Sequence, residues 1–219
     1  MGVFNRLFGG ISKIRTGSRN NPVWVEGGLS AHLASDRQLF NLTIGKWPGT
    51  GKNRKDLKLI YERWQAAVKF AQKYIRHTPY SVADRIVLAD LLRMGHAVDV
   101  RGAGDECLHL LNEALKMEPK NAEAHFVLGS FYLAENIASA PLAEQHLLEA
   151  ARLANPNVNP ETYEKLGFAC LHQKKMGEAV VYFENYMQLA GEVPPMRDLV
   201  TKLKAGHDVQ INFKQKGLK

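Results

Sequence analysis

Two neighbouring stretches of the chain carry the same pattern, and this pattern decides the fold. Residues 122–156 read AEAHFVLGSFYLAENIASAPLAEQHLLEAARLANP, and residues 160–191 read PETYEKLGFACLHQKKMGEAVVYFENYMQLAG. When they are superimposed, the Leu-Gly at 128–129 falls on the Leu-Gly at 166–167, which is 38 residues later. A repeat of this length has room for two helices and a turn, so it predicts an array of helix pairs.

A third and weaker copy lies upstream of these two. Leu88 and Ala89 take the place of the Leu-Gly. We therefore predict repeats at about residues 81–119, 121–156 and 159–191, and an all-α fold. One helix pair cannot bury its apolar face alone, so the pairs must stack and share a core.

The pattern resembles the tetratricopeptide repeat, which is marked by Leu-Gly, an aromatic residue, small residues and a closing proline. In the middle copy the matching residues are Leu128, Gly129, Tyr132, Ala143, Ala150 and Pro156. In the last copy they are Tyr163, Leu166, Gly167, Ala179 and Phe183. The last copy departs at Cys170 and Tyr186, where the family has Tyr and Ala. The resemblance implies a short helical solenoid of about three helix pairs.

Local signals mark where the helices start and stop. Ser81 begins a capping box, Asp105 and Asn121 are candidate N-caps, and Asn159 stands before a proline at the first helical position. Gly191 ends the last repeat. These signals depend on neighbouring residues only, so they support the helix pairs without the resemblance.

Two glycines stand inside predicted helices. Gly129 and Gly167 each cost about 1 kcal/mol relative to alanine at such a position. This cost is understandable where a neighbouring helix must approach closely, because a glycine has no side chain to separate the two backbones. We therefore expect close helix contacts at both positions.

Segments outside the repeats are predicted to cap them. A long amphipathic helix at residues 56–77 precedes the first repeat, and a short helix at residues 196–204 follows the last, so the solenoid with its caps spans residues 56–206. Residues 21–55 are rich in Gly, Pro, Asn and Ser and are predicted to be irregular. Within them, the apolar stretch 39–44 is either a strand or a segment that packs on the repeats.

The resemblance implies a binding groove on the concave face, which is formed by the first helix of each pair. The predicted groove residues are Ile86, Asp90, Glu123, Phe126, Ser130, Leu133, Glu161, Glu164, Phe168 and His172. This apolar and acidic mixture favours a partner protein or peptide that offers basic and apolar residues. A subset of the family clamps chaperone carboxylates with Lys, Asn, Asn, Lys and Arg, but the matching places here are Ile86, Asp90, Val127, Glu161 and Lys165. These residues argue against a chaperone clamp.

The net charge of +7 is unevenly distributed. Residues 1–80 contain 14 basic and 4 acidic residues, residues 81–196 contain 9 and 16, and residues 197–219 contain 6 and 2. An acidic centre thus lies between two basic arms, the second of which includes a basic tail at residues 207–219. The arms can bind phosphate groups, an anionic membrane or the acidic centre itself. Because the centre is acidic, we do not expect the chain to bind nucleic acid.

Residues 1–20 form a basic amphipathic arm without any acidic residue. Its apolar and basic side chains can contact a membrane interface or a polyanion, and packing on the solenoid, disorder and a mitochondrial transit peptide remain alternatives. The residues predicted to make such a contact are Phe4, Arg6, Leu7, Phe8, Lys13 and Arg15. This arm defines the second functional hypothesis, a peripheral membrane or polyanion-binding protein.

Residues for chemistry are sparse. The eight histidines are scattered, and Cys107 and Cys170 fall at inward repeat positions, so no catalytic set, metal site or cofactor is predicted. No apolar run is long enough for a transmembrane helix, and two cysteines fit a reducing compartment. We predict an intracellular, mainly cytoplasmic, non-catalytic adaptor or scaffold, with a peripheral position on a membrane as the alternative. The oligomeric state stays open.

Overall fold

The computed structural model describes residues 28–43 and 54–207 of the chain. Within these two ranges the chain is helical and has no β-strand, which confirms the predicted all-α class. In chain order, the elements are α2 (Gly28–His32), α3 (Ala34–Thr43), α4 (Arg54–Ile75), α5 (Val82–His96), α6 (Ala103–Met117), α7 (Ala122–Glu135), the 3-10 turn η1 (Ile137–Ser139), α8 (Ala140–Ala154), α9 (Pro160–His172), α10 (Met176–Ala190) and α11 (Pro194–Lys204).

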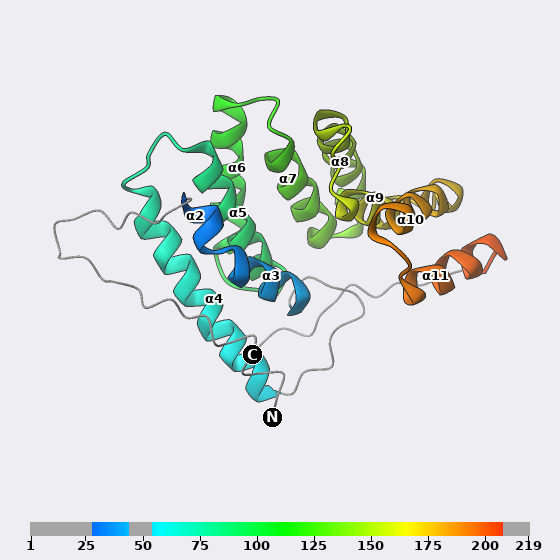
Figure 1. Cartoon of the computed structure of the whole chain (residues 1–219), viewed down its shortest axis with the longest axis horizontal. Helices are drawn as coiled ribbons and strands as arrows, with labels where there is room; N and C mark the ends of the chain where they lie inside the picture. The colour runs from blue at the N-terminus through cyan, green and yellow to red at the C-terminus, as the bar shows by residue number, and fades with distance from the viewer. Residues whose placement is uncertain (1–27, 44–53, 208–219) are drawn as a thin grey trace.

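The central helices follow one another as three pairs (Figure 1). Helix α5 packs on α6, α7 packs on α8, and α9 packs on α10. Neighbouring pairs also touch, because α7 contacts α5 and α9, and α8 contacts α9. Each predicted repeat, at 81–119, 121–156 and 159–191, encloses one pair. The first helices α5, α7 and α9 therefore lie next to one another through the array.

The predicted N-caps are present at three helices. The Ser81 hydroxyl accepts a hydrogen bond from the Asp84 backbone N–H at 3.2 Å, and the side chains of Asn121 and Asn159 each accept one at 3.0 Å. The prediction for Asp105 was wrong. Helix α6 begins earlier, at Ala103, because Gly102 precedes it with φ +76° and turns the chain into the helix. Asp105 therefore lies in the first turn, where its charge favours the helix dipole.

Both helical glycines lie against the second helix of their own pair. A Cβ atom added at Gly129 would be 2.7 Å from Leu147 Cγ, and one added at Gly167 would be less than 3.0 Å from carbons of the Phe183 ring. Real Cβ atoms do not come this close to other heavy atoms. The predicted close approach is thus confirmed, and it fixes the distance between the helices of these two pairs.

We expect Gly167→Ala to lower the free energy of unfolding by about 1–3 kcal/mol, because the added methyl group must displace the Phe183 ring from a packed core. Gly177→Ala is the control, since a Cβ there meets nothing within 4 Å and alanine favours the helix. Urea denaturation of both variants measures the difference. Equal stabilities would contradict the close approach.

Residues 28–43 correct the prediction that residues 21–55 are irregular. They form α2 and α3, and the segment 39–43 is helical instead of a strand. Leu29, Leu33 and Phe40 are at most 3% exposed and belong to the same core as α4 and α5. Their spacing of four and seven residues places them on one face of consecutive helical turns, which explains why they pack together.

The predicted N-terminal capping helix is α4, which begins two residues earlier than expected at Arg54 and ends at Ile75. It packs on α5, and the buried Trp64 indole N–H donates a hydrogen bond to the Leu91 carbonyl at 2.7 Å. An ion pair between Arg63 and Asp36 joins α4 to α3. Helices α2, α3 and α4 together therefore cover the first pair.

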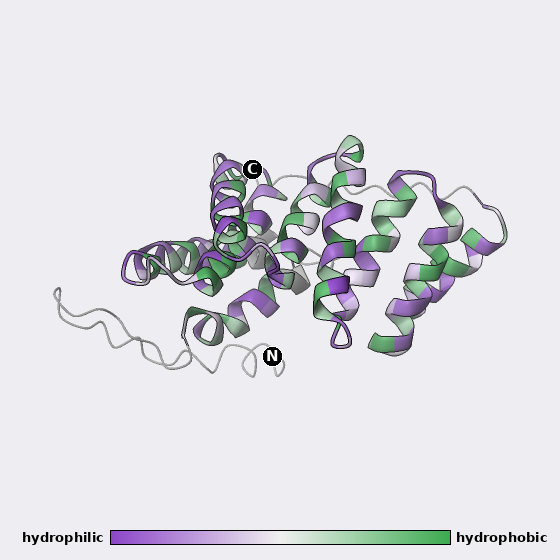
Figure 2. Cartoon of the chain, turned by 90° about the horizontal axis from the view of Figure 1, so that it is seen from above, coloured by the Kyte–Doolittle hydropathy of each residue, from purple (hydrophilic) through white to green (hydrophobic). Residues whose placement is uncertain are grey.

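The C-terminal cap is α11, which packs on α10. Its buried residues are Met196, Leu199, Val200 and Leu203, which include the three predicted inward positions. The helix begins at Pro194 because prolines fit the first turn, where their missing N–H would have no helical partner. Figure 2 shows hydrophobic and hydrophilic residues interleaved along the helices of the array, as stacking amphipathic helices require.

None of the helices in residues 28–43 and 54–207 combines the length and the hydrophobicity needed to cross a membrane.

Candidate functional site

A pocket of about 360 Å³ lies between the first helices of the three pairs. We call it the central pocket. Helices α5, α7 and α9 line it, together with the end of α8, the α8–α9 connection and one side chain of α3. Its lining residues are Arg37, Asp90, Arg93, Ala122, Glu123, Phe126, Ala150, Ala154, Asn157, Asn159, Glu161, Thr162 and Lys165.

Four of the ten predicted groove residues line this pocket, and they come from all three first helices. They are Asp90 of α5, Glu123 and Phe126 of α7, and Glu161 of α9. Asn121 and Asn159 cap α7 and α9, so Glu123 and Glu161 lie in the first turns of these helices, one turn or less from the cap. The packing of the first helices thus gathers residues that are far apart in the sequence.

The other six predicted residues lie elsewhere, and three of them must be withdrawn from the groove surface. Ile86, Ser130 and Phe168 are at most 5% exposed. Ile86 belongs to the first core, Phe168 packs edge-on against Phe183, and the Ser130 hydroxyl donates to the Phe126 carbonyl. Some of the predicted groove positions thus line the pocket, whereas others are used for packing between helices.

The remaining three predicted residues are partly exposed but do not line the central pocket. Leu133 packs against the second core, which α9, α10 and α11 form. Burial lowers the pKa of His172, so this imidazole is neutral at pH 7. Glu164 lies on α9 and contributes its negative charge to the surroundings of Lys165.

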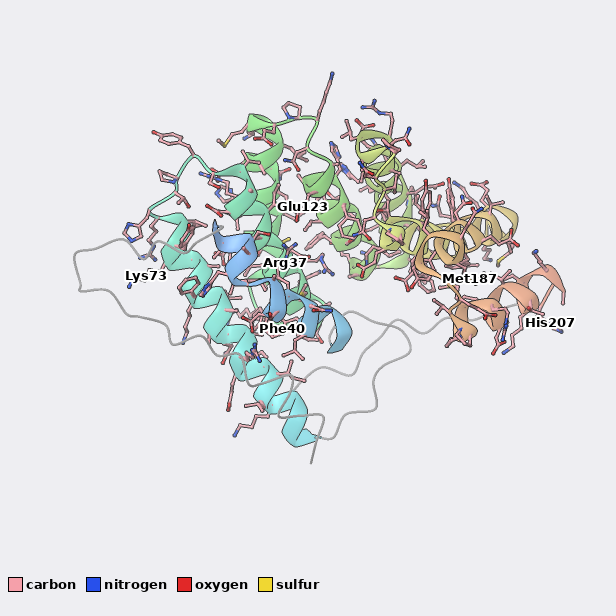
Figure 3. The ribbon with its side chains drawn as sticks, viewed as in Figure 1. Arg37, Phe40, Lys73, Glu123, Met187 and His207 are labelled. Atoms are coloured by element: carbon pink, nitrogen blue, oxygen red, sulfur yellow. The ribbon has the colours of Figure 1, made fainter. Side chains whose placement is uncertain are left out.

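Arg37 is the main lining residue that the groove prediction missed. Its guanidinium Nη2 lies 3.2 Å from Asp90 Oδ2 and 3.1 Å from Glu123 Oε1, so one side chain of α3 joins the carboxylates of two first helices. Arg37 and Glu123 are labelled in Figure 3. The available sequence signal was the helical spacing of Leu29, Leu33 and Phe40, which places Arg37 on the same face. The acidic side of the predicted groove is therefore already bound to a basic group of the same chain.

Asp90 is the buried centre of this charge network. Asp90 is 3% exposed, and its carboxylate lies 2.8 Å from Arg93 Nη2, in addition to its contact with Arg37. Burial by itself would raise the pKa of Asp90, but Arg93 and Arg37 outweigh burial and hold the pKa below its ordinary value of 3.8. Asp90 is therefore an ionised structural residue that anchors two guanidinium groups at the pocket wall.

Lys165 differs from Asp90, because its charge is not paired with an opposite charge of the described residues. Its ammonium lies 5.7 Å from the centre of the Phe126 ring, and it forms no hydrogen bond or ion pair with the described residues. Burial and the charge of Arg93 lower the pKa of Lys165, while Glu161, Glu164 and Asp90 oppose this shift. The pocket thus offers an aromatic ring and an ammonium group that a ligand can contact directly.

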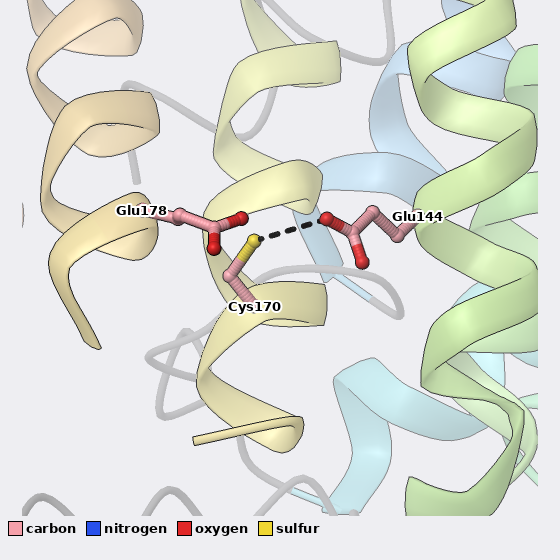
Figure 4. Close-up of side chains that lie close together, drawn as sticks. All are labelled: Glu144, Cys170 and Glu178. Atoms are coloured by element: carbon pink, nitrogen blue, oxygen red, sulfur yellow. Dashed lines mark hydrogen bonds between the residues drawn. The ribbon is translucent and has the colours of Figure 1, made fainter. Parts of the chain in front are cut away.

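A second cluster contains side chains that are typical metal ligands, but its central carboxylate is already hydrogen-bonded to groups of the protein. Ligand atoms of Glu144, Cys170 and Glu178 lie within 4.8 Å of one another (Figure 4). Burial, helped by both glutamates, raises the pKa of Cys170 to about 12, and its thiol donates to Glu144. Lys175 and Gln173 also donate to Glu144, each at 2.7 Å. These hydrogen bonds link α8 to the α9–α10 pair, and the ammonium of Lys175 already supplies the positive charge.

Among the described residues, neither the cysteines nor the basic arms form a further candidate binding or catalytic site. Burial raises the pKa of Cys107 to about 12, so this thiol keeps its proton at neutral pH. The membrane or polyanion contact predicted for Phe4, Arg6, Leu7, Phe8, Lys13 and Arg15 lies outside the described residues, as does all of the basic tail except His207.

No protein-family model matches the chain, and no curated protein matches it.

Proposed function

We propose that the chain is a non-catalytic adaptor whose three helix pairs form a tetratricopeptide-like solenoid, and whose central pocket binds a segment of a partner protein. The observation that carries this proposal is the position of the pocket, which takes residues from α5, α7 and α9 at once. A segment bound there would contact all three helix pairs. Ligands of repeat arrays bind in this way, because the stacked repeats form one extended concave surface.

The chemistry of the lining specifies the partner segment. Phe126 and the alanines at positions 122, 150 and 154 offer an apolar surface, so we expect an apolar side chain of the partner to lie on it. Asp90 and Glu123 are already bound to Arg37, which leaves Glu161 as the pocket carboxylate for a basic group. The proposed ligand is therefore a peptide with an apolar and a basic residue. Of the acidic residues predicted for the groove, Glu161 is the one that we expect to contact the basic residue.

The test is a selection of peptides from a random library on the full-length protein, followed by affinity measurements on variants. We expect Phe126→Ala and Glu161→Gln each to weaken a selected apolar and basic peptide about tenfold or more, because each removes a central contact. Val181→Ala and Glu184→Gln are the matched controls, since both residues are exposed on α10 away from the pocket.

Peptides that bind the wild type and all four variants equally would show that the pocket is not the binding site. Peptides that lack an apolar residue would contradict the role of Phe126 even if they bind. Urea denaturation of each variant is the folding control, because Phe126 also packs against the first core.

A further inference from the structure

The structure brings together two histidines that stand 21 residues apart in the sequence. His125 belongs to α7 and His146 to α8, the two helices of the middle pair. Their Nδ1 atoms lie 3.0 Å apart, and the ring of Tyr132 stacks on His146 with 5.8 Å between centroids. Neither histidine lines the central pocket, so this pair is separate from the proposed peptide site.

The surroundings of His125 determine which of its nitrogens carries the hydrogen. Its Nε2 lies 3.1 Å from the carbonyl oxygen of Pro119, and because a carbonyl can only accept, Nε2 must be the donor. In the neutral ring, Nδ1 of His125 then has a free electron pair directed at Nδ1 of His146. The two Nδ1 atoms share one hydrogen, which His146 donates.

A histidine held in this way is oriented as metal-binding histidines are. Such residues donate the second ring N–H to a backbone carbonyl or a carboxylate, which fixes the tautomer and aims the other nitrogen at the metal. Two imidazole nitrogens on one tetrahedral Zn²⁺ ion, at bond lengths of about 2.0 Å, lie about 3.3 Å apart. The observed separation of 3.0 Å is within a few tenths of an ångström of this value.

We propose that His125 and His146 form a binding site for one divalent late transition-metal ion, with Zn²⁺ as the probe and water molecules completing the coordination. The ion takes the place of the shared hydrogen. As it binds, the hydrogen on Nδ1 of His146 moves to Nε2 of the same ring, so both ligands stay neutral imidazoles and no proton is released from the neutral pair. Imidazole nitrogen is a preferred ligand for these metals.

Glu149, Arg152 and Lys120 are charged groups near the pair. Glu149 follows His146 by one turn of α8, and its carboxylate is close enough to His125 for their charges to interact. Arg152 holds this carboxylate at 2.6 and 2.7 Å, and Lys120 faces it from the α6–α7 connection. The negative charge of Glu149 is therefore balanced by these two cations, so the affinity for a metal ion comes from the two imidazole nitrogens.

The site is tested by isothermal titration calorimetry, in which ZnCl₂ is added to the full-length protein at pH 7 and the affinity and stoichiometry of binding are measured. We expect one ion per chain, and we expect His125→Gln and His146→Gln each to reduce the affinity at least tenfold, because each removes one of two protein ligands. His109→Gln is the control, since His109 is an exposed histidine on α6 that lies beside Glu113. Binding should weaken at pH 5, because protons compete for the same electron pairs.

Nitrogen-15 NMR of the histidine rings provides a second measurement that needs no variant. Zn²⁺ should shift the Nδ1 resonances of His125 and His146 to the range of metal-bound nitrogen, and it should leave the other histidines unchanged. Unchanged spectra of both rings, no binding at millimolar zinc, or equal binding by the two glutamine variants and the wild type would each overturn the proposal. Shifts confined to other histidines would do the same.

Discussion

Asp90→Asn lowers the free energy of unfolding by about 3–5 kcal/mol, the usual cost of removing one partner from a buried ion pair. The carboxylate of Asp90 compensates the charges of Arg93 and Arg37, and it is nearly inaccessible to water. Asparagine keeps the shape of the side chain but loses the negative charge, so two guanidinium groups remain at the pocket wall with less compensation. Urea denaturation at pH 7 measures the loss.

Glu184→Gln is the control for Asp90→Asn, because Glu184 and Lys204 form an exposed ion pair that contributes at most about 1 kcal/mol. The pKa of Asp90 is lowered in the folded protein, so its stabilisation is present above the ordinary pKa of 3.8 and is lost as the pH falls below it. The gap between wild type and Asp90→Asn should therefore shrink in acid. A gap that stays constant from pH 7 to pH 3 would contradict the ion pair as its cause.

Phe40→Ala should lower the free energy of unfolding by about 3–5 kcal/mol, because it empties a site that a whole aromatic ring fills. Phe40 is completely buried in the core that α2 and α3 share with α4 and α5. Gln38→Ala, on the exposed side of the same helix, is the control and should change stability by less than about 0.5 kcal/mol. Thermal or urea denaturation of the full-length variants distinguishes the two.

The Phe40→Ala result also decides whether residues 28–43 belong to the folded unit. An irregular segment, as the sequence predicted, would tolerate alanine at position 40 without loss of stability. A large loss would show that α2 and α3 hold Arg37 against Asp90 and Glu123 as a permanent part of the pocket.

The helix pairs were predictable because their signals are local. The caps at Ser81, Asn121 and Asn159 act on backbone groups two or three residues away, so the sequence contains all that is needed to place them. The glycines at 129 and 167 were informative for a related reason, since a residue that disfavours a helix persists there only if packing requires it. Helices α2 and α3 were missed because the Gly, Pro, Asn and Ser content of residues 21–55 was given more weight than the helical spacing of Leu29, Leu33 and Phe40.

The candidate site was predictable only in part. The repeat register located Asp90, Glu123, Phe126 and Glu161, because equivalent positions of stacked repeats face the same side. It could not place Arg37, which stands 86 residues before Glu123 and outside every repeat. The acidic groove expected from the repeats is consequently a pocket whose carboxylates are largely paired.

The sequence by itself determined that the repeats are helical, where the three pairs begin and end, and which helix comes first in each pair. These properties depend on hydrogen bonds and side-chain periodicity within a few residues. Only the tertiary structure decided that Arg37 pairs with the carboxylates of Asp90 and Glu123 and that His125 faces His146. Such contacts join segments distant in the chain, and they depend on how helices pack, which no local pattern encodes.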